Sequence, residues 1–352
     1  MFRKFLGAPL ALGLAVLAGQ ALAQPAFMAP TDLPSMQSPQ ALHAPLNALV
    51  QAGARMISAG QRGHILYSDD GKDWKQAQVP VSSDLTALSF PSATQGWAVG
   101  HEGVVLHSSD GGQTWSKQLD GKQIAELLKQ YGQNANPDDP VAARQRQEAE
   151  ALVAQGADQP LLDVWFEDES RGFVVGAFNL ILRTEDGGKT WTPWMDHVDN
   201  PRGMHLYAMR PAAGSLFIVG EQGLVVKFDS REQRFQALEL PYQGSLFGVV
   251  GNADVVVVYG LRGNAYRSVD GGANWQKIDT GIDAGLTGGV VLADGSIVLV
   301  SQAGHVLRSL DKGASFTRLK VSRVAANFAV APAPGEALAL AGLGGVRLES
   351  LQ

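Results

Sequence analysis

Three stretches of the chain place a hydroxyl, a carboxylate and a tryptophan at the same spacing, and a carboxylate so placed could serve as a general acid. The pattern is Ser/Thr-x-Asp-Gly-Gly-x-x-Trp, at residues 108–115, 184–191 and 268–275. A hydroxyl and a carboxylate beside two glycines can also hydrogen-bond the backbone of their own turn. Because three copies in three places cannot form one active site, we expect these side chains to be structural.

The motif resembles the Asp-box, also called the bacterial neuraminidase repeat, and weaker copies stand elsewhere in the chain. Residues 68–74 are one residue shorter, residues 309–316 are looser, and residues 228–235 have lost the polar core. Three clean copies are strong evidence for a fold and weak evidence for chemistry. The predicted Asp-box residues are Ser68, Asp70, Trp74, Ser108, Asp110, Trp115, Thr184, Asp186, Trp191, Ser268, Asp270 and Trp275.

The Asp-box is the second half of a longer repeat, whose first half is a Gly-x-x-Gly turn. We expect glycine to open this turn because it adopts positive φ cheaply, and Asn179, the one non-glycine at the second position, to tolerate a left-handed conformation. The residues eight positions after the first glycine are separated by 40, 76, 44, 40, 41 and 41 residues. A period of about 40 residues with about four short strands is typical of a propeller blade. We therefore predict an all-β fold, a seven-bladed β-propeller of four-stranded antiparallel blades.

The interval of 76 residues contains a short helical insertion, residues 120–160, between blades 2 and 3. We predict a helix over residues 123–131 and a second over residues 141–155, which follows Asp139 and Pro140. The propeller then fills residues 47–352. Its last repeat offers only three strands, so residues 24–46, an extended segment with five prolines, are expected to close the last blade as an edge strand, where proline is tolerated.

Composition and the first residues indicate an exported protein. Residues 1–23 resemble a cleaved signal peptide, with Arg3 and Lys4 before a short apolar run and cleavage after Ala23. We expect a periplasmic protein that does not span the membrane after signal removal. The formal charge of −6 gives no reason to expect nucleic-acid binding. With no cysteine and no histidines paired at ligand spacing, we expect no metal and no cofactor.

Two groups of residues are candidates for contact with a partner. The residue before the Asp-box hydroxyl is basic in four of seven repeats, and these side chains either pair between blades or form a basic ring that grips an acidic partner. The connection after blade 3 holds His197, Arg202 and His205 with two aspartates, and solvated loop chemistry is the simpler interpretation. By strand topology the insertion, this connection and the Gly-x-x-Gly turns share one face, opposite the Asp-box turns.

Enzyme signatures are absent from the sequence. Neuraminidase-type glycosidases need an arginine triad, a tyrosine nucleophile with a glutamate partner and an acid, and no convincing set of these occurs. Other glycosidases on this fold use two carboxylates, for which sequence spacing is no test. The sequence also has no Gly-x-Ser-x-Gly elbow and no phosphate-binding loop.

Residues 47–352 resemble the photosystem II stability/assembly factor-like family of Asp-box propellers. The resemblance rests on the pattern Gly-x-x-Gly-x-x-Leu-Arg-Ser/Thr-x-Asp-Gly-Gly-x-x-Trp, with residues 182–191 as the best local match. It implies a non-enzymatic protein that binds a partner and assists assembly or repair of a membrane complex. In bacteria without a photosystem it implies, in some cases, work alongside an exporter of the resistance-nodulation-division type. It also assigns Arg183, Arg267 and Arg308 to the family's repeat arginine, a candidate contact for the partner.

We therefore expect a periplasmic, non-enzymatic propeller that binds a protein and assists the assembly or stability of a membrane-associated complex. One alternative is a carbohydrate-active propeller that binds or cleaves glycans, and another is a structural propeller that self-associates through its insertion. Paired carboxylates beside exposed aromatic residues would favour glycans, and a broad charged or apolar face would favour protein. The expected contact residues are Arg183, Arg267, Arg308, Arg202, His197, His205 and Arg262.

Overall fold

The computed structural model describes residues 28–134, 140, 143–144, 146–147, 150, 154 and 158–351. The predicted signal peptide, residues 1–23, lies outside this part of the chain, as does most of the second predicted helix, residues 141–155.

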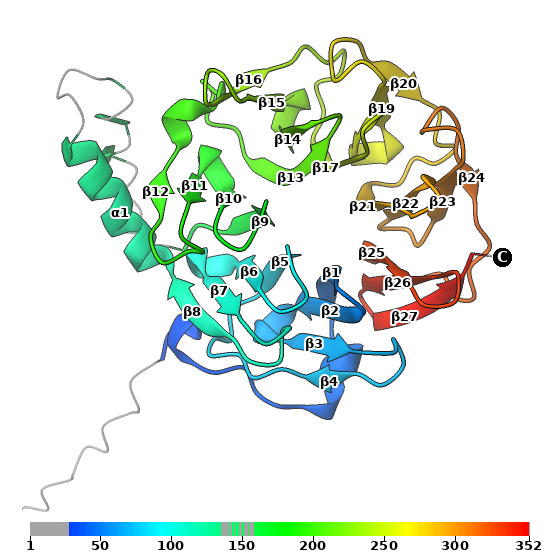
Figure 1. Ribbon diagram of the computed structural model, residues 1–352, viewed down its shortest axis with the longest axis horizontal. Coiled ribbons are helices and arrows are strands. Elements are labelled where there is room, and N and C mark those ends of the chain that lie inside the picture. Colours follow the sequence, from blue (N-terminus) through cyan, green and yellow to red (C-terminus); the bar gives the residue numbers. More distant parts are fainter. Residues whose placement is uncertain are drawn as a thin grey trace, which may run out of the picture.

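The strands of the described residues form seven antiparallel sheets, six with four strands and one with three, arranged as blades around a central axis (Figure 1). This confirms the predicted seven-bladed propeller. Blades 1 to 3 are β1 (Leu46–Ala52), β2 (Arg55–Gly60), β3 (Ile65–Ser68) and β4 (Lys75–Gln76); β5 (Leu85–Ser89), β6 (Gly96–Gly100), β7 (Val105–Ser108) and β8 (Ser116–Leu119); and β9 (Leu161–Phe166), β10 (Gly172–Gly176), β11 (Ile181–Thr184) and β12 (Thr192–Pro193). Blades 4 to 7 are β13 (Leu206–Ala212), β14 (Ser215–Gly220), β15 (Val225–Asp229) and β16 (Arg234–Ala237); β17 (Leu246–Gly251), β18 (Val256–Gly260), β19 (Ala265–Ser268) and β20 (Gln276–Ile278); β21 (Leu286–Val291), β22 (Ile297–Ser301), β23 (Val306–Ser309) and β24 (Thr317–Arg318); and β25 (Asn327–Ala333), β26 (Ala337–Gly342) and β27 (Gly345–Ser350).

The hydrophobic core lies between the blades. The first strands of adjacent blades contact one another all the way round, including β1 with β25, so the ring is closed. Four of the second strands, β6, β10, β18 and β22, are buried at every residue, as their apolar sequences require. Large side chains also pack across the seams: Trp97 of blade 2 stacks on Phe166 of blade 3 with ring centroids 3.6 Å apart.

The Gly-x-x-Gly turns need glycine for two different reasons. Gly60, the first glycine of its turn, is extended (φ −169°), so the expectation of positive φ was wrong there. A Cβ at Gly60 would lie 2.2 Å from the carbonyl oxygen of Pro45, so this position needs glycine because two backbones meet. Gly63, the second glycine, does have positive φ, and Asn179 is left-handed at its equivalent position, as predicted.

Each Asp-box turn is held by its own side chains. Asp110 accepts hydrogen bonds from the hydroxyl of Ser108 (2.9 Å), from the backbone N–H groups of Gln113 and Thr114 (3.0 Å each) and from the hydroxyl of Thr114 (2.6 Å). The indole N–H of Trp115 donates to the carbonyl of Gly112 (3.0 Å). This carboxylate is fully occupied by its own turn.

The Asp-box turns also join neighbouring blades. Arg55 of blade 1 donates to the carbonyl of Gly111 in the turn of blade 2 (3.1 Å), Gln118 of blade 2 to Gly187 of blade 3 (2.8 Å), and Lys227 of blade 4 to Gly271 of blade 5 (2.9 Å). Blade 4 has no such turn, because residues 228–235 lack the glycines. There the seam with blade 3 is filled by aromatic rings, among which Trp194 packs against Phe173, Phe228 and Phe235.

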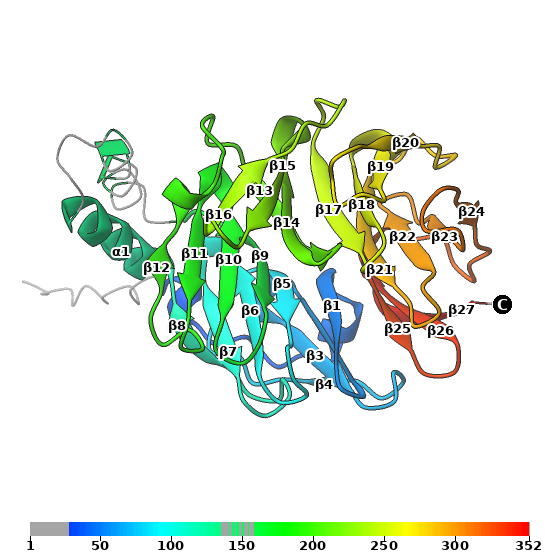
Figure 2. The same ribbon diagram turned by 45° about the horizontal axis from the view of Figure 1, so that its top comes forward.

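The insertion begins with α1 (Gly121–Asn134), which lies at the rim beside β8 and β12 (Figures 1 and 2). Asp120 caps the helix: its carboxylate accepts from Lys122 and Gln123, while the Gln123 side chain accepts from the Asp120 N–H. Ile124, Ala125 and Leu128 are buried in the core of blades 2 and 3. The first predicted helix is confirmed and is longer than residues 123–131.

The described part of the N-terminal segment crosses three blades and forms no strand before β1. Residues 29–45, here called the N-terminal strap, contact Lys117 of blade 2 through Thr31 and blade 1 through Ser35 and Gln37. The strap ends in a 3-10 turn, η2 (Pro39–His43), whose Ala41 and Leu42 pack with β27, the free edge of the three-stranded blade 7. The prediction of an edge strand was therefore wrong. The short turn buries apolar side chains over the edge without continuing the ladder.

The Asp-box network predicts the effect of one substitution. Asp110→Ala should lower the free energy of unfolding by about 2 kcal/mol, because several donors of the turn lose their acceptor. Urea denaturation followed by tryptophan fluorescence measures this. Ser109→Ala, at an exposed neighbour, is the control and should change stability by less than about 0.5 kcal/mol. Equal effects of the two substitutions would contradict the network.

The same turns predict acid sensitivity. The side chain of Asn274 and the backbone hold the pKa of Asp270 at about 2, and the side chain of Ser315 and the backbone hold the pKa of Asp311 at about 2, against 3.8 for a free aspartate. Because a depressed pKa means that the unfolded chain binds more protons, this stabilisation is complete above 3.8 and is lost as pH falls towards 2. Urea midpoints should therefore drop between about pH 4 and about pH 2, and less steeply in Asp311→Asn. An equal slope in that variant would refute the assignment.

Candidate protein-binding face

The start of the insertion, the connection after blade 3 and the Gly-x-x-Gly turns lie on one face of the ring. The turn after β6 meets the start of α1, where a Cβ at Gly103 would lie 2.9 Å from the backbone of Gly121. The turn after β10 bonds the connection, since Asn179 donates its backbone N–H to the carbonyl of Met204 (3.1 Å). The hydroxyl of Tyr131 on α1 donates to Asp196 in the same connection (2.9 Å). We call this surface the insertion face; the Asp-box turns lie on the opposite face.

An aromatic row crosses the insertion face. Phe178 packs edge-on against His205 (4.5 Å between ring centroids), His205 against Tyr207 (6.1 Å), and Tyr207 against Phe247 (5.8 Å). The row runs from the tip of the turn after β10 to the mouth of the central channel, which Tyr207 and Phe247 line. Because Phe178 remains 54% exposed, the row presents an apolar surface to solvent at its outer end.

Phe178 also has an unusual backbone. It is left-handed, with φ 53°, a conformation that bulky residues rarely adopt. The equivalent residues in other turns, Glu102, Gln222 and Arg262, are left-handed too, so the turn imposes the conformation whatever the side chain. Placing a phenylalanine there costs about 1 kcal/mol and leaves its ring half in water, which points to a functional use.

Four of the predicted contact residues lie on this face. His205 accepts the backbone N–H of Phe178 through Nδ1 (3.1 Å). His197 stacks on Trp194 and bonds Asp196 (2.8 Å). Arg202 donates to Gln222 (2.7 Å), and Arg262 is exposed at its turn. The face therefore combines exposed apolar tips with basic side chains.

The repeat arginines lie away from this group, at the Asp-box ends of three third strands. Arg183 pairs with Glu185 (2.7 Å) and lies over the ring of Trp194 (4.8 Å). Arg308 pairs with Asp294 (2.6 Å) and donates to Ser296 (3.2 Å). The Nε of Arg267 is buried and has no hydrogen-bond partner among the described residues. The seven predicted contact residues thus form two groups, and their role in partner binding stays a prediction.

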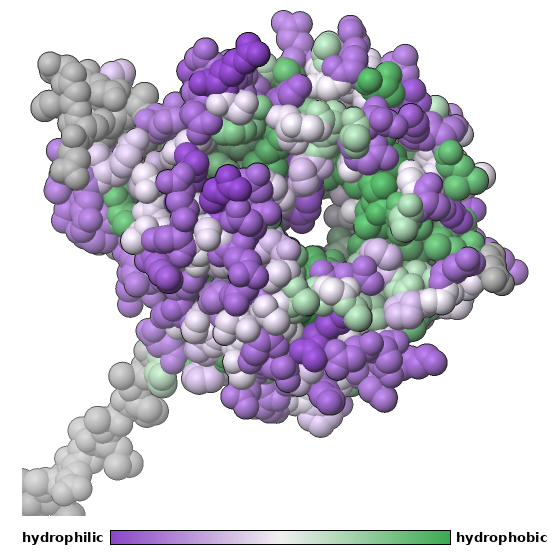
Figure 3. Space-filling model, in the orientation of Figure 1, coloured by the Kyte–Doolittle hydropathy of each residue, from purple (hydrophilic) through white to green (hydrophobic). Residues whose placement is uncertain are grey.

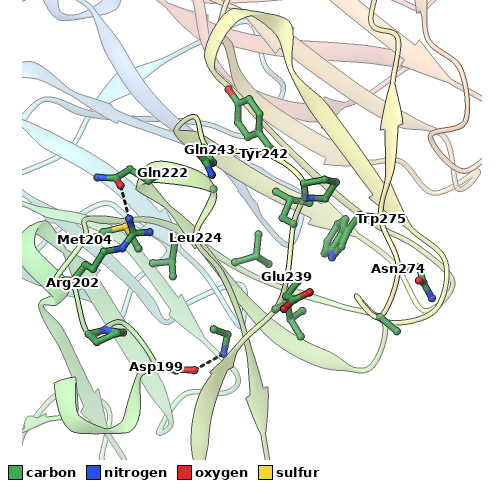
Figure 4. A pocket seen from close by; sticks show the side chains of 18 residues that line it. Asp199, Arg202, Met204, Gln222, Leu224, Glu239, Tyr242, Gln243, Asn274 and Trp275 are labelled. Carbon is green, nitrogen blue, oxygen red and sulfur yellow. Dashed lines mark hydrogen bonds between the residues drawn. The ribbon is translucent and has the colours of Figure 1, made fainter.

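Two hollows border these groups. A rim groove of about 1000 Å³ between blades 4 and 5 is lined by Asp199, Arg202, Glu239, Tyr242 and Trp275 (Figure 4). A smaller groove of about 420 Å³ opens between blades 3 and 4, where the Asp-box turn is missing, and Arg183 lines it. Seen along the axis, the molecule is also hollowed at its centre (Figure 3).

Some features of this face were not found from the sequence. Nothing in the order of residues marks Phe178 as exposed, because the same turn position holds Glu, Gln or Arg elsewhere. A phenylalanine at the left-handed position of a repeated turn was nevertheless a usable signal. The described residues contain no cluster of three His, Asp or Glu side chains suited to a metal, and none of their helices is long and apolar enough to cross a bilayer.

The fold defines a seven-bladed β-propeller. The family profile described as photosynthesis system II assembly factor YCF48 matches residues 60–130 and 142–319, and the chain belongs to this family. The resemblance predicted from the repeat is thereby confirmed.

Named relatives match over part of their length. The photosystem II assembly lipoproteins Ycf48 of a Synechococcus species and of Prochlorococcus marinus are 26% and 32% identical over 156 and 171 residues, which are 43% and 46% of this chain. The matches span about half of those proteins, 46% and 49%. The solved structure of YCF48 bound to D1 peptide has a TM-score of 0.62 at 16% identity and covers 90% of this chain and 96% of its own, which shows a shared fold.

The local contacts of the repeat arginines predict a mild loss of stability on their removal. The triple variant Arg183→Ala, Arg267→Ala, Arg308→Ala should stay folded and lose less than about 2 kcal/mol, because partly exposed ion pairs and cation–π contacts are each weak. Circular dichroism with urea denaturation measures this. Loss of the native spectrum would instead show that these arginines hold the blades together.

Proposed function

We propose that this protein is a non-enzymatic periplasmic propeller that binds a segment of a partner protein on its insertion face. By doing so it assists the assembly or stability of a membrane-associated complex, for which an exporter in a non-photosynthetic bacterium is our first candidate. The observation that carries the proposal is Phe178, held exposed in a strained turn beside His205. An exposed aromatic anchor among polar neighbours is typical of a binding hot spot.

Three further considerations, one of them a prediction from the sequence, support this proposal. The chain belongs to a family described as an assembly factor, and a structural relative is a complex with a peptide. The predicted signal peptide supports export. The Asp-box carboxylates are occupied by their turns, which supports a protein without catalytic residues there. In this scheme Arg202, Arg262, His197 and His205 surround the anchor, while Arg183, Arg267 and Arg308 offer a second contact near the Asp-box face.

A matched pair of variants tests where the partner binds. Phe178→Asp should reduce capture of the partner at least tenfold, as expected for a hot-spot residue worth about 2 kcal/mol. Aspartate tolerates the left-handed conformation better than phenylalanine does, so folding should be unaffected. The control is Leu310→Asp, which removes an apolar side chain that is 77% exposed on the opposite face. The measurement is in-cell crosslinking of the tagged mature protein, with mass spectrometry of the captured membrane proteins.

Each outcome has a defined meaning. Loss of one membrane complex in Phe178→Asp, with capture retained in Leu310→Asp, supports the insertion face. Loss only in the triple arginine variant moves the contact to the Asp-box side. Failure of the unaltered protein to capture any membrane protein reproducibly would reject the proposed function.

The rim groove supports a second candidate, glycan binding. Its lining combines the carboxylates of Asp199 and Glu239 with the aromatic rings of Tyr242 and Trp275 (Figure 4), the kind of surface on which sugar rings stack. A glycan array probed with the mature protein and with Tyr242→Ala tests this candidate. Binding that depends on Tyr242 would support it, and absence of binding would remove it.

A further inference from the structure

The central channel has a volume of about 350 Å³ and is lined by the first strands of all seven blades (Figure 3). This is the size of a site for a small organic ligand. Most of the lining is apolar or consists of small residues, and Asp163 and Arg210 are the charged side chains among the described residues that line it.

Strand register shows how unusual these residues are. In every blade, one residue of the first strand pairs with the next-to-last residue of the second strand. From blade 1 to blade 7 these first-strand residues are Ala48, Ala87, Asp163, Ala208, Gly248, Gly288 and Ala329. Six of these are Ala or Gly, and Asp163 of blade 3 is the exception. Two positions further along the first strand, Arg210 of blade 4 stands where the other blades have uncharged residues.

Tyr259 of blade 5 is a third departure. The equivalent residues on the other second strands are Ala or Val. Its hydroxyl reaches the channel because two glycines leave room: a Cβ at Gly248 would lie 2.3 Å from this oxygen, and one at Gly289 would lie 3.1 Å from it. Tyr259 is only 4% exposed, yet within the described residues its hydroxyl has no hydrogen-bond partner. Its oxygen is not among the buried unpartnered side-chain atoms, so it opens on the channel, where it can donate to water or to a ligand.

In the ion pair of Asp163 and Arg210, the guanidinium is the group exposed to the channel. The carboxylate of Asp163 accepts from the backbone N–H groups of Val164 (2.9 Å) and Met209 (2.7 Å) and from the guanidinium of Arg210. The side chain of Asp163 is 4% exposed and that of Arg210 is 40% exposed. Among the described residues, only one nitrogen of the guanidinium, Nη1, is used, for Asp163 and for the Met209 carbonyl, so the other nitrogens can donate to a ligand.

Burial raises the pKa of the Tyr259 hydroxyl, and the nearby charge of Arg210 opposes that rise. The hydroxyl is therefore a neutral donor at physiological pH, and it interacts electrostatically with Arg210.

We propose that the channel binds a small carboxylate, held by the free nitrogens of Arg210 and by the hydroxyl of Tyr259. A carboxylate matches this arrangement because its two oxygens accept from a guanidinium and from a second donor. The apolar lining fits an alkyl or aryl body. An inter-blade ion pair alone would explain Asp163 and Arg210, but it would leave unexplained the hydroxyl that Gly248 and Gly289 admit to the channel.

The test compares ligands that differ in charge. Ligand-observed NMR titration of the mature protein uses benzoate and acetate as free carboxylates, and N-acetyl-dialanine as a chain-terminal carboxylate. Benzamide and the amidated peptide are the neutral counterparts. The acids should bind and the amides should not. A preference for the peptide acid over benzoate and acetate identifies a chain end as the ligand, and the reverse identifies a free acid.

Tyr259→Phe is the decisive variant, since it removes one oxygen atom and keeps the ring. It should weaken carboxylate binding about tenfold, the effect of losing one hydrogen bond to a charged group. Its thermal midpoint without ligand should equal or exceed that of the unaltered protein, because the hydroxyl has no partner among the residues that the structure describes. Tyr266→Phe is the control: its hydroxyl bonds Pro241 (3.5 Å) outside the channel lining, and binding should not change.

Three results would overturn the site. They are no carboxylate binding at millimolar concentration, equal binding of acids and amides, and unchanged affinity in Tyr259→Phe. The site does not depend on the partner-binding proposal, because Phe178→Asp should leave carboxylate affinity intact.

Discussion

Seven first strands share one axis, and the closeness of their backbones limits the side chains that the ring can hold. At one register position in the channel lining six blades carry Ala or Gly. A larger residue is accommodated where a neighbour gives room, as Gly248 and Gly289 do for Tyr259. The same constraint explains why Gly60 is glycine despite its extended conformation: the second strand ends against the backbone of the first.

Away from the axis the blades diverge, and different contacts hold them. There the Asp-box turn of one blade overlies the blade before it, and a side chain of that blade donates to the carbonyl of a turn glycine. At these three seams the turn thus supplies the carbonyl that joins one blade to the next. At the seam between blades 3 and 4, aromatic packing around Trp194 takes the place of this hydrogen bond. Because no turn carbonyl faces Arg183 there, its guanidinium contacts Glu185 and the indole of Trp194.

The fold could be predicted from the sequence because the same residue spacing recurs in successive blades. Glycine and hydroxyl spacing gave seven blades, the one long interval gave the insertion, and strand topology divided the loops between two faces. The strap was mispredicted, since its prolines are compatible with an edge strand and do not show that η2 covers β27 instead. Asp163, Arg210 and Tyr259 lie up to 96 residues apart, and each is unusual only when strand register places it beside its equivalents. Pairing of Arg183 and Arg308 with local carboxylates likewise depends on side-chain directions that spacing does not fix.

The N-terminal strap has a consequence for the order in which the molecule can form. It bonds blades 1 and 2 through residues 29–38 and covers β27 through η2, so it joins the earliest and the latest parts of the chain. Synthesis delivers the strap first, and β27 arrives about 300 residues later. Until then Ala41 and Leu42 can pack only against blade 1, and the flank of β1 that meets β25 is open. An unfinished chain therefore exposes this apolar flank of β1 for most of its synthesis. Two such chains held close together could exchange their last blades, so that each ring is closed by the other's C-terminal strands.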